Sequence, residues 1–166
     1  MRVKTILDED FTNYKKASMF IGTIACDGKC CHESGIPLSV CQNDGWRESA
    51  TLKVDDNDIC KRYLENPMTS AIVIGGLEPF EQFGEVLRFV RILRTPYQCN
   101  DDVVIYTGFL PCEIADDLDL LSAYPNIIVK FGRYVPGCKP AYDETLGVYL
   151  ASPNQFARRL LEGGAI

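Results

Sequence analysis

Short apolar runs alternate with amphipathic stretches along this chain, and most of the apolar runs are bounded by turn residues. Short runs rich in β-branched residues are typical of strands, whereas apolar residues spaced by three and four are typical of helices. The pattern predicts strands at 2–7, 19–25, 70–74, 103–107 and 126–130. It predicts helices at 55–65, 81–94 and 113–123, an extended piece at 145–150, and a terminal helix beginning near Ser152 or Pro153.

The alternation of strand and helix predicts an α/β fold with five or six mainly parallel strands in a single domain, residues 1–166. The loops that follow parallel strands open at one edge of the sheet, where α/β proteins bind ligands. Four loops should meet there: the cysteine-rich segment after Ala25, Gly75-Gly76, Thr107-Gly108, and Phe131-Gly132-Arg133.

Composition narrows the class of protein. Apolar residues make up 46% and charged residues 24% of the 166 residues, which is typical of globular proteins and excludes disordered and fibrous classes. The net charge of −6 argues against a protein that binds nucleic-acid phosphates. The beginning of the chain lacks the apolar segment of a signal peptide, and no apolar run approaches the ~20 residues of a membrane span. We therefore expect a cytoplasmic protein without a membrane partner.

Eight cysteines are the main chemical signal. Four disulfides would require an oxidising compartment, so free thiols, a metal or a cluster fit better. No C-x-x-C pair exists, which disfavours zinc knuckles and thioredoxin-like motifs. Cys26 and Cys30 form a C-x3-C pair, and Cys41 follows after ten intervening residues. Three thiolates on one loop can bind three irons of a [4Fe-4S] cluster and leave the fourth iron open for a ligand.

Around these cysteines the sequence resembles the radical S-adenosylmethionine superfamily, in particular the activating proteins of anaerobic ribonucleoside-triphosphate reductase. The resemblance covers about Met19 to Ala157. Those proteins carry C-x3-C-x2-C followed by Asn and Trp. Cys26 and Cys30 match the first two positions, Glu33 stands at the third, and Cys41-Gln42-Asn43-Asp44-Gly45-Trp46 is similar to the third cysteine with its Asn and Trp. The predicted cluster ligands are therefore Cys26, Cys30 and Cys41, with Cys31 as the alternative for the second or the third ligand position.

Four further motifs occur in family order. Gly75-Gly76-Leu77-Glu78-Pro79 resembles G-G-E-P with one Leu interposed, and Tyr106-Thr107-Gly108-Phe109 resembles Y-T-G-Y. Lys130-Phe131-Gly132-Arg133-Tyr134 is similar to D-G-R-F with Phe131 in place of Asp, and Ala151-Ser152-Pro153-Asn154-Gln155 to G-S-S-N-Q. The resemblance implies that S-adenosylmethionine binds at Gly75, Gly76, Glu78, Thr107 and Arg133. Taken singly, these residues also fit a tight turn, a helix start or a surface cation.

The resemblance implies a partial open (β/α) barrel and a definite chemistry. S-adenosylmethionine would be cleaved reductively at the cluster, and the 5′-deoxyadenosyl radical would abstract hydrogen from a glycine of a glycyl-radical enzyme, such as anaerobic ribonucleotide reductase. Reduced flavodoxin or ferredoxin would donate the electron. Little chain remains to build a closed pocket, so we expect an exposed edge, with the inserted segment 33–40 beside it. The alternatives are a non-catalytic iron–sulfur or metal-binding module and a radical enzyme that acts on a small heterocycle.

The remaining candidates are weaker. His32 is the only histidine, which disfavours a His-dependent hydrolytic triad, and it is expected to face solvent. The scattered cysteines Cys60, Cys99, Cys112 and Cys138 are expected to be inert thiols, because free Cys behaves as a small apolar residue.

Overall fold

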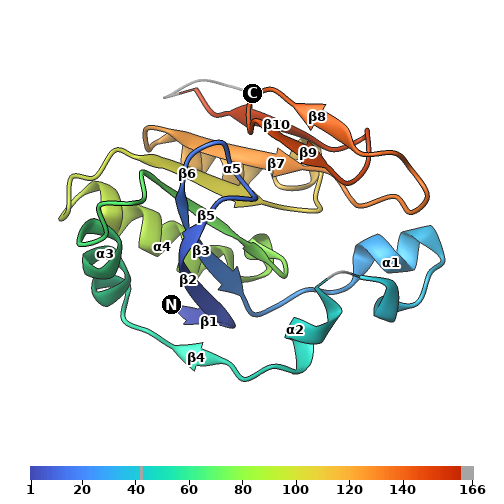
Figure 1. Ribbon diagram of the computed structural model, residues 1–166, viewed down its shortest axis with the longest axis horizontal. Helices are drawn as coiled ribbons and strands as arrows, with labels where there is room; N and C mark the ends of the chain where they lie inside the picture. Colours follow the sequence, from blue (N-terminus) through green and yellow to red (C-terminus); the bar gives the residue numbers. More distant parts are fainter. Residues whose placement is uncertain (42, 162–166) are drawn as a thin grey trace.

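The computed structural model describes residues 1–41 and 43–161, and its centre is a six-stranded mixed sheet (Figure 1). The strand order is β10-β7-β6-β5-β3-β2. The pairings β3–β5, β5–β6 and β6–β7 are parallel, whereas β2 and β10 are antiparallel edge strands. The bounds are β2 (Thr5–Asp10), β3 (Ser18–Thr23), β5 (Ala71–Gly76), β6 (Asp102–Tyr106), β7 (Ile127–Phe131) and β10 (Phe156–Arg159). The chain is therefore an α/β protein with a mixed sheet.

Two short antiparallel pairs flank this sheet. β1 (Arg2–Val3) pairs with β4 (Leu52–Lys53), and β8 (Ala141–Asp143) pairs with β9 (Val148–Leu150). Between β3 and β4 the cysteine-rich segment forms α1 (Lys29–Ser34), the 3-10 turn η1 (Leu38–Val40) and α2 (Asp44–Glu48). Figure 1 shows these short elements grouped at one end of the molecule.

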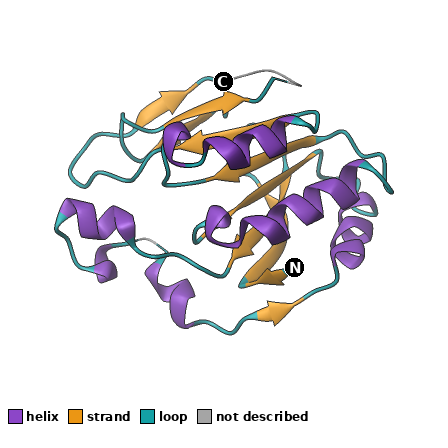
Figure 2. Ribbon diagram, turned by 180° about the vertical axis from the view of Figure 1, so that it is seen from behind, coloured by secondary structure: helices purple, strands orange, loops and turns teal. Residues whose placement is uncertain are grey.

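Three longer helices cover one face of the sheet (Figure 2). They are α3 (Asp56–Leu64), α4 (Phe83–Arg94) and α5 (Ala115–Ser122), and the 3-10 turns η2 (Pro79–Gln82) and η3 (Pro111–Glu113) directly precede α4 and α5. Each helix buries an apolar stripe: Ile59, Phe89 and Leu118 are fully buried against strand residues such as Ile74 and Ile105. Their removal from water stabilises this layer. A bilayer-spanning helix is not found in these described ranges.

The opposite face of the sheet is packed against loops, a hairpin and the short helix α2 instead of the three long helices. Strands alternate their side chains between faces, so Val73 and Val104 point away from the helices. They pack with Tyr14 of the segment 11–17 and with Leu146 and Leu150 around the β8–β9 hairpin. Trp46 of α2 packs against the same cluster. A cavity lies between these segments and the sheet.

The strands and helices predicted from the apolar pattern are found with small shifts at their ends, except that the predicted strand 2–7 is two strands, β1 and β2, in different sheets. The prediction of a terminal helix is wrong: residues after Leu150 form a turn and then β10, which pairs antiparallel with β7. Phe156 packs on Phe131 with ring centroids 5.4 Å apart, and Leu160 is 8% exposed. Pairing with an open sheet edge and burial of these side chains outweigh local helix propensity. The mainly parallel sheet predicted from the alternation is found in part: the pairings β3–β5, β5–β6 and β6–β7 are parallel, whereas the two edge pairings are antiparallel.

Candidate functional site

A cavity of about 490 Å³ lies at the carboxyl ends of the parallel strands. The loops after β3, β5, β6 and β7 all contribute to its wall, as the parallel arrangement predicts. The residues from these loops and from the strand ends are Cys26, Cys30, Cys31, Cys41, Gly76, Leu77, Glu78, Thr107, Gly108, Lys130, Gly132 and Tyr134. The wall continues along the sheet to Phe20, Tyr106 and Tyr149.

The four clustered cysteines all line this cavity, but they are not equivalent. Cys26, Cys30 and Cys41 are partly buried, whereas Cys31 is 4% exposed. Gly28 has φ 75°, a left-handed conformation that favours glycine, and its N–H donates to Cys26 Sγ at 3.4 Å. Burial raises the pKa of the Cys26 and Cys30 thiols, so metal binding at these sulfurs would release protons.

The arrangement of the cysteines favours some metal groups over others. Within 1–41 and 43–161, no three side chains of His, Cys, Asp or Glu converge closely enough to hold one metal ion. A mononuclear zinc site, which needs four ligands around a point, therefore does not match. A four-iron cube instead takes its thiolates at separate corners. Cys26, Cys30 and Cys41 line one cavity and are the type of ligand that such a cluster takes, and Cys31 lines the same cavity; that they hold a cluster stays a prediction.

Arg47 of α2 is a neighbour of the cysteines that sequence reasoning missed. Its Nη1 donates to the Cys26 carbonyl at 2.7 Å and its Nη2 lies 3.5 Å from Cys26 Sγ. The arginine therefore fixes the loop after β3 and places a positive charge beside the first cysteine. Its position directly after Trp46 is the one sequence signal, since that places it on the element that follows Cys41.

Gly76 lines the cavity, but the space beside it is already filled. A Cβ on Gly76 would lie 2.3 Å from Cζ3 of Trp46, and one on Gly22 of β3 would lie 2.7 Å from the same atom. Gly76 also has φ 87°. Gly75 is not among the cavity residues described; it faces Tyr106, whose Cβ would be 3.2 Å from a Cβ at Gly75. These glycines are thus required first by packing inside the protein.

Glu78 is buried and holds two loops together. It is 7% exposed, and its carboxylate accepts hydrogen bonds from Phe80 N at 3.1 Å, Thr107 Oγ1 at 2.7 Å and Gly108 N at 2.8 Å. Burial raises the pKa of this carboxyl despite those donors. Glu78 and Thr107 therefore join the loop after β5 to the loop after β6, and both remain on the cavity wall.

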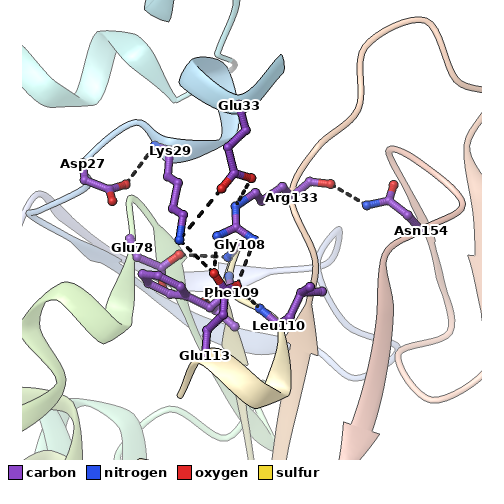
Figure 3. A network of polar contacts seen from close by, with 11 residues as sticks. Asp27, Lys29, Glu33, Glu78, Gly108, Phe109, Leu110, Glu113, Arg133 and Asn154 are labelled. Atoms are coloured by element: carbon purple, nitrogen blue, oxygen red, sulfur yellow. Dashed lines mark hydrogen bonds and ion pairs between the residues drawn. The ribbon is translucent and has the colours of Figure 1, made fainter. Parts of the chain in front are cut away.

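Arg133 makes its charged contacts in an ion-pair network beside the cavity (Figure 3). Its guanidinium makes two hydrogen bonds to Glu113 of η3, at 2.8 and 2.7 Å, and an ion pair to Glu33 of α1 at 2.9 Å. Lys29 Nζ also donates to Glu113, at 2.8 Å. Hydrogen bonds from Arg133 and Lys29 hold the pKa of Glu113 far below its usual range. Arg133 is not among the cavity residues described, so its direct role in ligand binding stays a prediction.

The other chemical candidates are not among the described residues that line the cavity. His32 is exposed on α1. Cys60 and Cys99 are buried in the core, and Cys112 and Cys138 are exposed. Gln42, part of the motif that contains Cys41, lies outside the described residues.

Comparisons with protein-family models, with curated proteins and with solved structures found no match.

Proposed function

We propose that this chain is a cytoplasmic radical S-adenosylmethionine protein that activates a glycyl-radical enzyme such as anaerobic ribonucleotide reductase. One observation carries the proposal: Cys26, Cys30 and Cys41 line the same cavity as the Gly76–Glu78 and Thr107–Gly108 loops, at the carboxyl ends of the parallel strands. A [4Fe-4S] cluster held by the three cysteines would supply the electron for reductive cleavage of S-adenosylmethionine.

The topology supports the finer fold, a partial open (β/α) barrel. The parallel strands β3, β5, β6 and β7 follow one another in sequence and in space, and α3, α4 and α5 pack on the same face. In a barrel the helices form the outer layer, and the inner face of the strands leads to the active site. Here the cavity lies on the side away from the helices.

Side chains around the cavity would position the cysteine loop, fix the loops opposite it and exclude water. Arg47 holds the Cys26 loop through the Cys26 carbonyl, and its charge favours the thiolate form of Cys26. Glu78 and Thr107 fix the loops opposite the cysteines. The aromatic side chains of Phe20, Trp46 and Tyr106 give the cavity an apolar wall, which excludes water from a bound ligand.

The inserted segment 33–40 supports a protein partner. It presents Leu38 and Val40 to solvent, 36% and 45% exposed, close to the cysteines. A small-molecule substrate is the second candidate, because β9 and Ala151 do line the cavity and so provide more wall than the chain length suggested. Reduced flavodoxin or ferredoxin is the proposed electron donor in either case.

The cluster is tested by anaerobic reconstitution with iron and sulfide. Cys26→Ala, Cys30→Ala and Cys41→Ala should each abolish the cluster absorbance and its electron paramagnetic resonance signal after reduction. The matched control is Cys138→Ala, which removes an exposed thiol and should leave the cluster intact. A normal cluster in Cys41→Ala would exclude Cys41 and assign the third ligand to Cys31.

The activity is tested by measuring 5′-deoxyadenosine after reduction in the presence of S-adenosylmethionine. A cluster without this product would favour the non-catalytic iron–sulfur module. With the host's glycyl-radical enzyme present, a glycyl radical doublet should appear in the resonance spectrum. If 5′-deoxyadenosine forms without a doublet for every candidate enzyme, the partner proposal fails and a small heterocycle becomes the better substrate.

A further inference from the structure

Lys130 is a buried cation at the end of β7 that the proposed chemistry does not use. Along this strand Val129 and Phe131 point to the helical layer, so Ile128 and Lys130 point to the opposite face. Lys130 is 7% exposed, yet it lines the cavity. An apolar side chain would continue the pattern of this face, so the lysine needs another explanation.

The ammonium group of Lys130 forms no ion pair in the described part of the chain, although the charges of Glu78 and Cys30 act on it from a longer distance. Its Nζ donates to the carbonyl oxygen of Gly132 at 3.0 Å and lies 5.8 Å from the centre of the Tyr106 ring. In the part of the chain that the structure describes, no carboxylate forms an ion pair with it, and Glu78 is already occupied by three donors. Burial lowers the pKa of Lys130 to about 8, which still leaves the amine mostly protonated at neutral pH.

A buried ammonium without a counter-ion destabilises a fold, because its hydration is lost and nothing replaces it. Such groups are concentrated at binding sites, where a ligand supplies the missing charge. Lys130 is the basic residue among the described residues that line the cavity. Arg133, the cation expected from the sequence to bind ligand, is already neutralised by Glu113 and Glu33.

We propose that Lys130 makes this end of the cavity an anion-binding site, where the bound molecule places a carboxylate or phosphate group against the lysine ammonium. The aromatic wall formed by Phe20, Trp46 and Tyr106 would contact the remainder of that molecule. Two sources supply this chemistry: the carboxylate of S-adenosylmethionine, or a phosphate on a second small molecule. The inference rests on the charge and the cavity, and it does not depend on an iron–sulfur cluster.

Anaerobic calorimetry on the protein as purified separates the sources. The titrants are S-adenosylmethionine, its decarboxylated analogue and inorganic pyrophosphate. The variants are Lys130→Met and the control Lys139→Met, which removes an exposed lysine. If the carboxylate is the anion, wild type should bind S-adenosylmethionine at least tenfold more tightly than the analogue, and Lys130→Met should abolish that preference. If phosphate is the anion, Lys130→Met should weaken pyrophosphate binding at least tenfold. Lys139→Met should match wild type with every titrant.

The possible failures are distinguishable. Lys130-dependent binding of pyrophosphate without binding of S-adenosylmethionine would support the anion site and contradict the proposed function. The anion site is overturned if wild type neither binds pyrophosphate nor prefers S-adenosylmethionine to its analogue, or if Lys130→Met binds like wild type. Thermal unfolding provides a readout of folding: Lys130→Met should unfold at the same or a higher temperature, because an unpaired buried charge is removed. A lower midpoint with unchanged affinities would assign Lys130 a purely structural bond to Gly132.

Discussion

Two glycines on neighbouring strands form the packing site of the single tryptophan, Trp46. Gly22 and Gly76 lie in the paired strands β3 and β5, and the Trp46 indole packs where their side chains would be. Trp46 also meets Phe20 edge to face, with ring centroids 5.7 Å apart, and Asn43 Nδ2 donates to the Gly76 carbonyl at 2.5 Å. Cys41 lies shortly before Asn43 and Trp46 in the chain. The packing of Trp46 on the two glycines therefore also helps to position Cys41, the third predicted ligand.

Gly76→Val tests whether the packing of Trp46 requires glycine at this position. The new side chain would collide with Trp46 and would have to adopt φ 87°, so we expect the free energy of unfolding to fall by about 2–4 kcal/mol. The fluorescence of the sole tryptophan should shift to longer wavelength as the indole leaves its packed position. Urea unfolding and the emission spectrum measure both effects.

Two comparisons identify the cause. Gly84→Ala, in the first turn of α4 with nothing within 4 Å, should stabilise the protein by about 0.4–1 kcal/mol. In a Trp46→Ala background the cost of Gly76→Val should be smaller, since the colliding ring is absent. An equal cost in both backgrounds would mean that backbone strain alone explains the requirement for glycine.

Among the elements, α1 is joined to two other segments by an ion-pair network. It carries Cys30 and Cys31, and its Lys29 and Glu33 join Glu113 and Arg133 to connect α1 with η3 and the loop after β7 (Figure 3). Glu33 occupies the position that corresponds to the third cysteine in the radical S-adenosylmethionine activating proteins that the sequence resembles. In this chain that position therefore contributes to a network that docks the helix beside the cavity.

Glu113→Gln should loosen α1, because it removes the carboxylate shared by Arg133 and Lys29. We expect the buried Cys31 thiol to react severalfold faster with a thiol reagent, as measured by peptide mass mapping. Glu144→Gln, which alters an exposed carboxylate, should react like wild type. Since the pKa of Glu113 is lowered in the folded protein, the network contributes its full stability above the ordinary Glu pKa of 4.5 and loses it as the pH falls from there through the folded value. Unchanged Cys31 reactivity would show that packing alone holds α1.

The elements also show where sequence patterns succeed. β5 and β6 are nearly continuous apolar runs, typical of buried parallel strands, and their loops could be predicted to share an edge. β10 was missed because its partner β7 is about 25 residues earlier in the chain, and local propensity contains no information on that pairing. The contact of Trp46 with Gly22 was missed for the same reason. The engagement of Arg133 was not predictable, because its partners come from two separate elements.

At the scale of the whole molecule, Asp102 joins the segment 11–17, which packs on the cavity side of the sheet, to the central strand β6. It is 5% exposed at the start of β6 and accepts hydrogen bonds from Tyr14 Oη at 3.0 Å and Lys16 Nζ at 2.5 Å. Arg159 of the edge strand β10 forms an ion pair with it at 2.8 Å. One carboxylate therefore ties the segment 11–17 and β10 to the central strands, although these segments are far apart in sequence.

Asp102→Asn should loosen the attachment of the segment 11–17 and of β10. Hydrogen bonds to a buried charged group each contribute about 1.5–3 kcal/mol, so we expect the free energy of unfolding to fall by about that amount at pH 7, as measured by urea titration.

Despite the effect of burial, hydrogen bonds from Lys16, Arg159 and Tyr14 lower the pKa of Asp102 from 3.8. A carboxyl with a lowered pKa stabilises the fold above its ordinary pKa and loses that contribution as the pH falls through the folded value. The difference between wild type and Asp102→Asn should thus be constant between pH 7 and about 5 and shrink only below the ordinary value, whereas Asp119→Asn, at an exposed position, should show no difference. A difference that persists unchanged in acid would assign the effect to packing rather than to the charge of Asp102 that joins the segment 11–17 and β10 to β6.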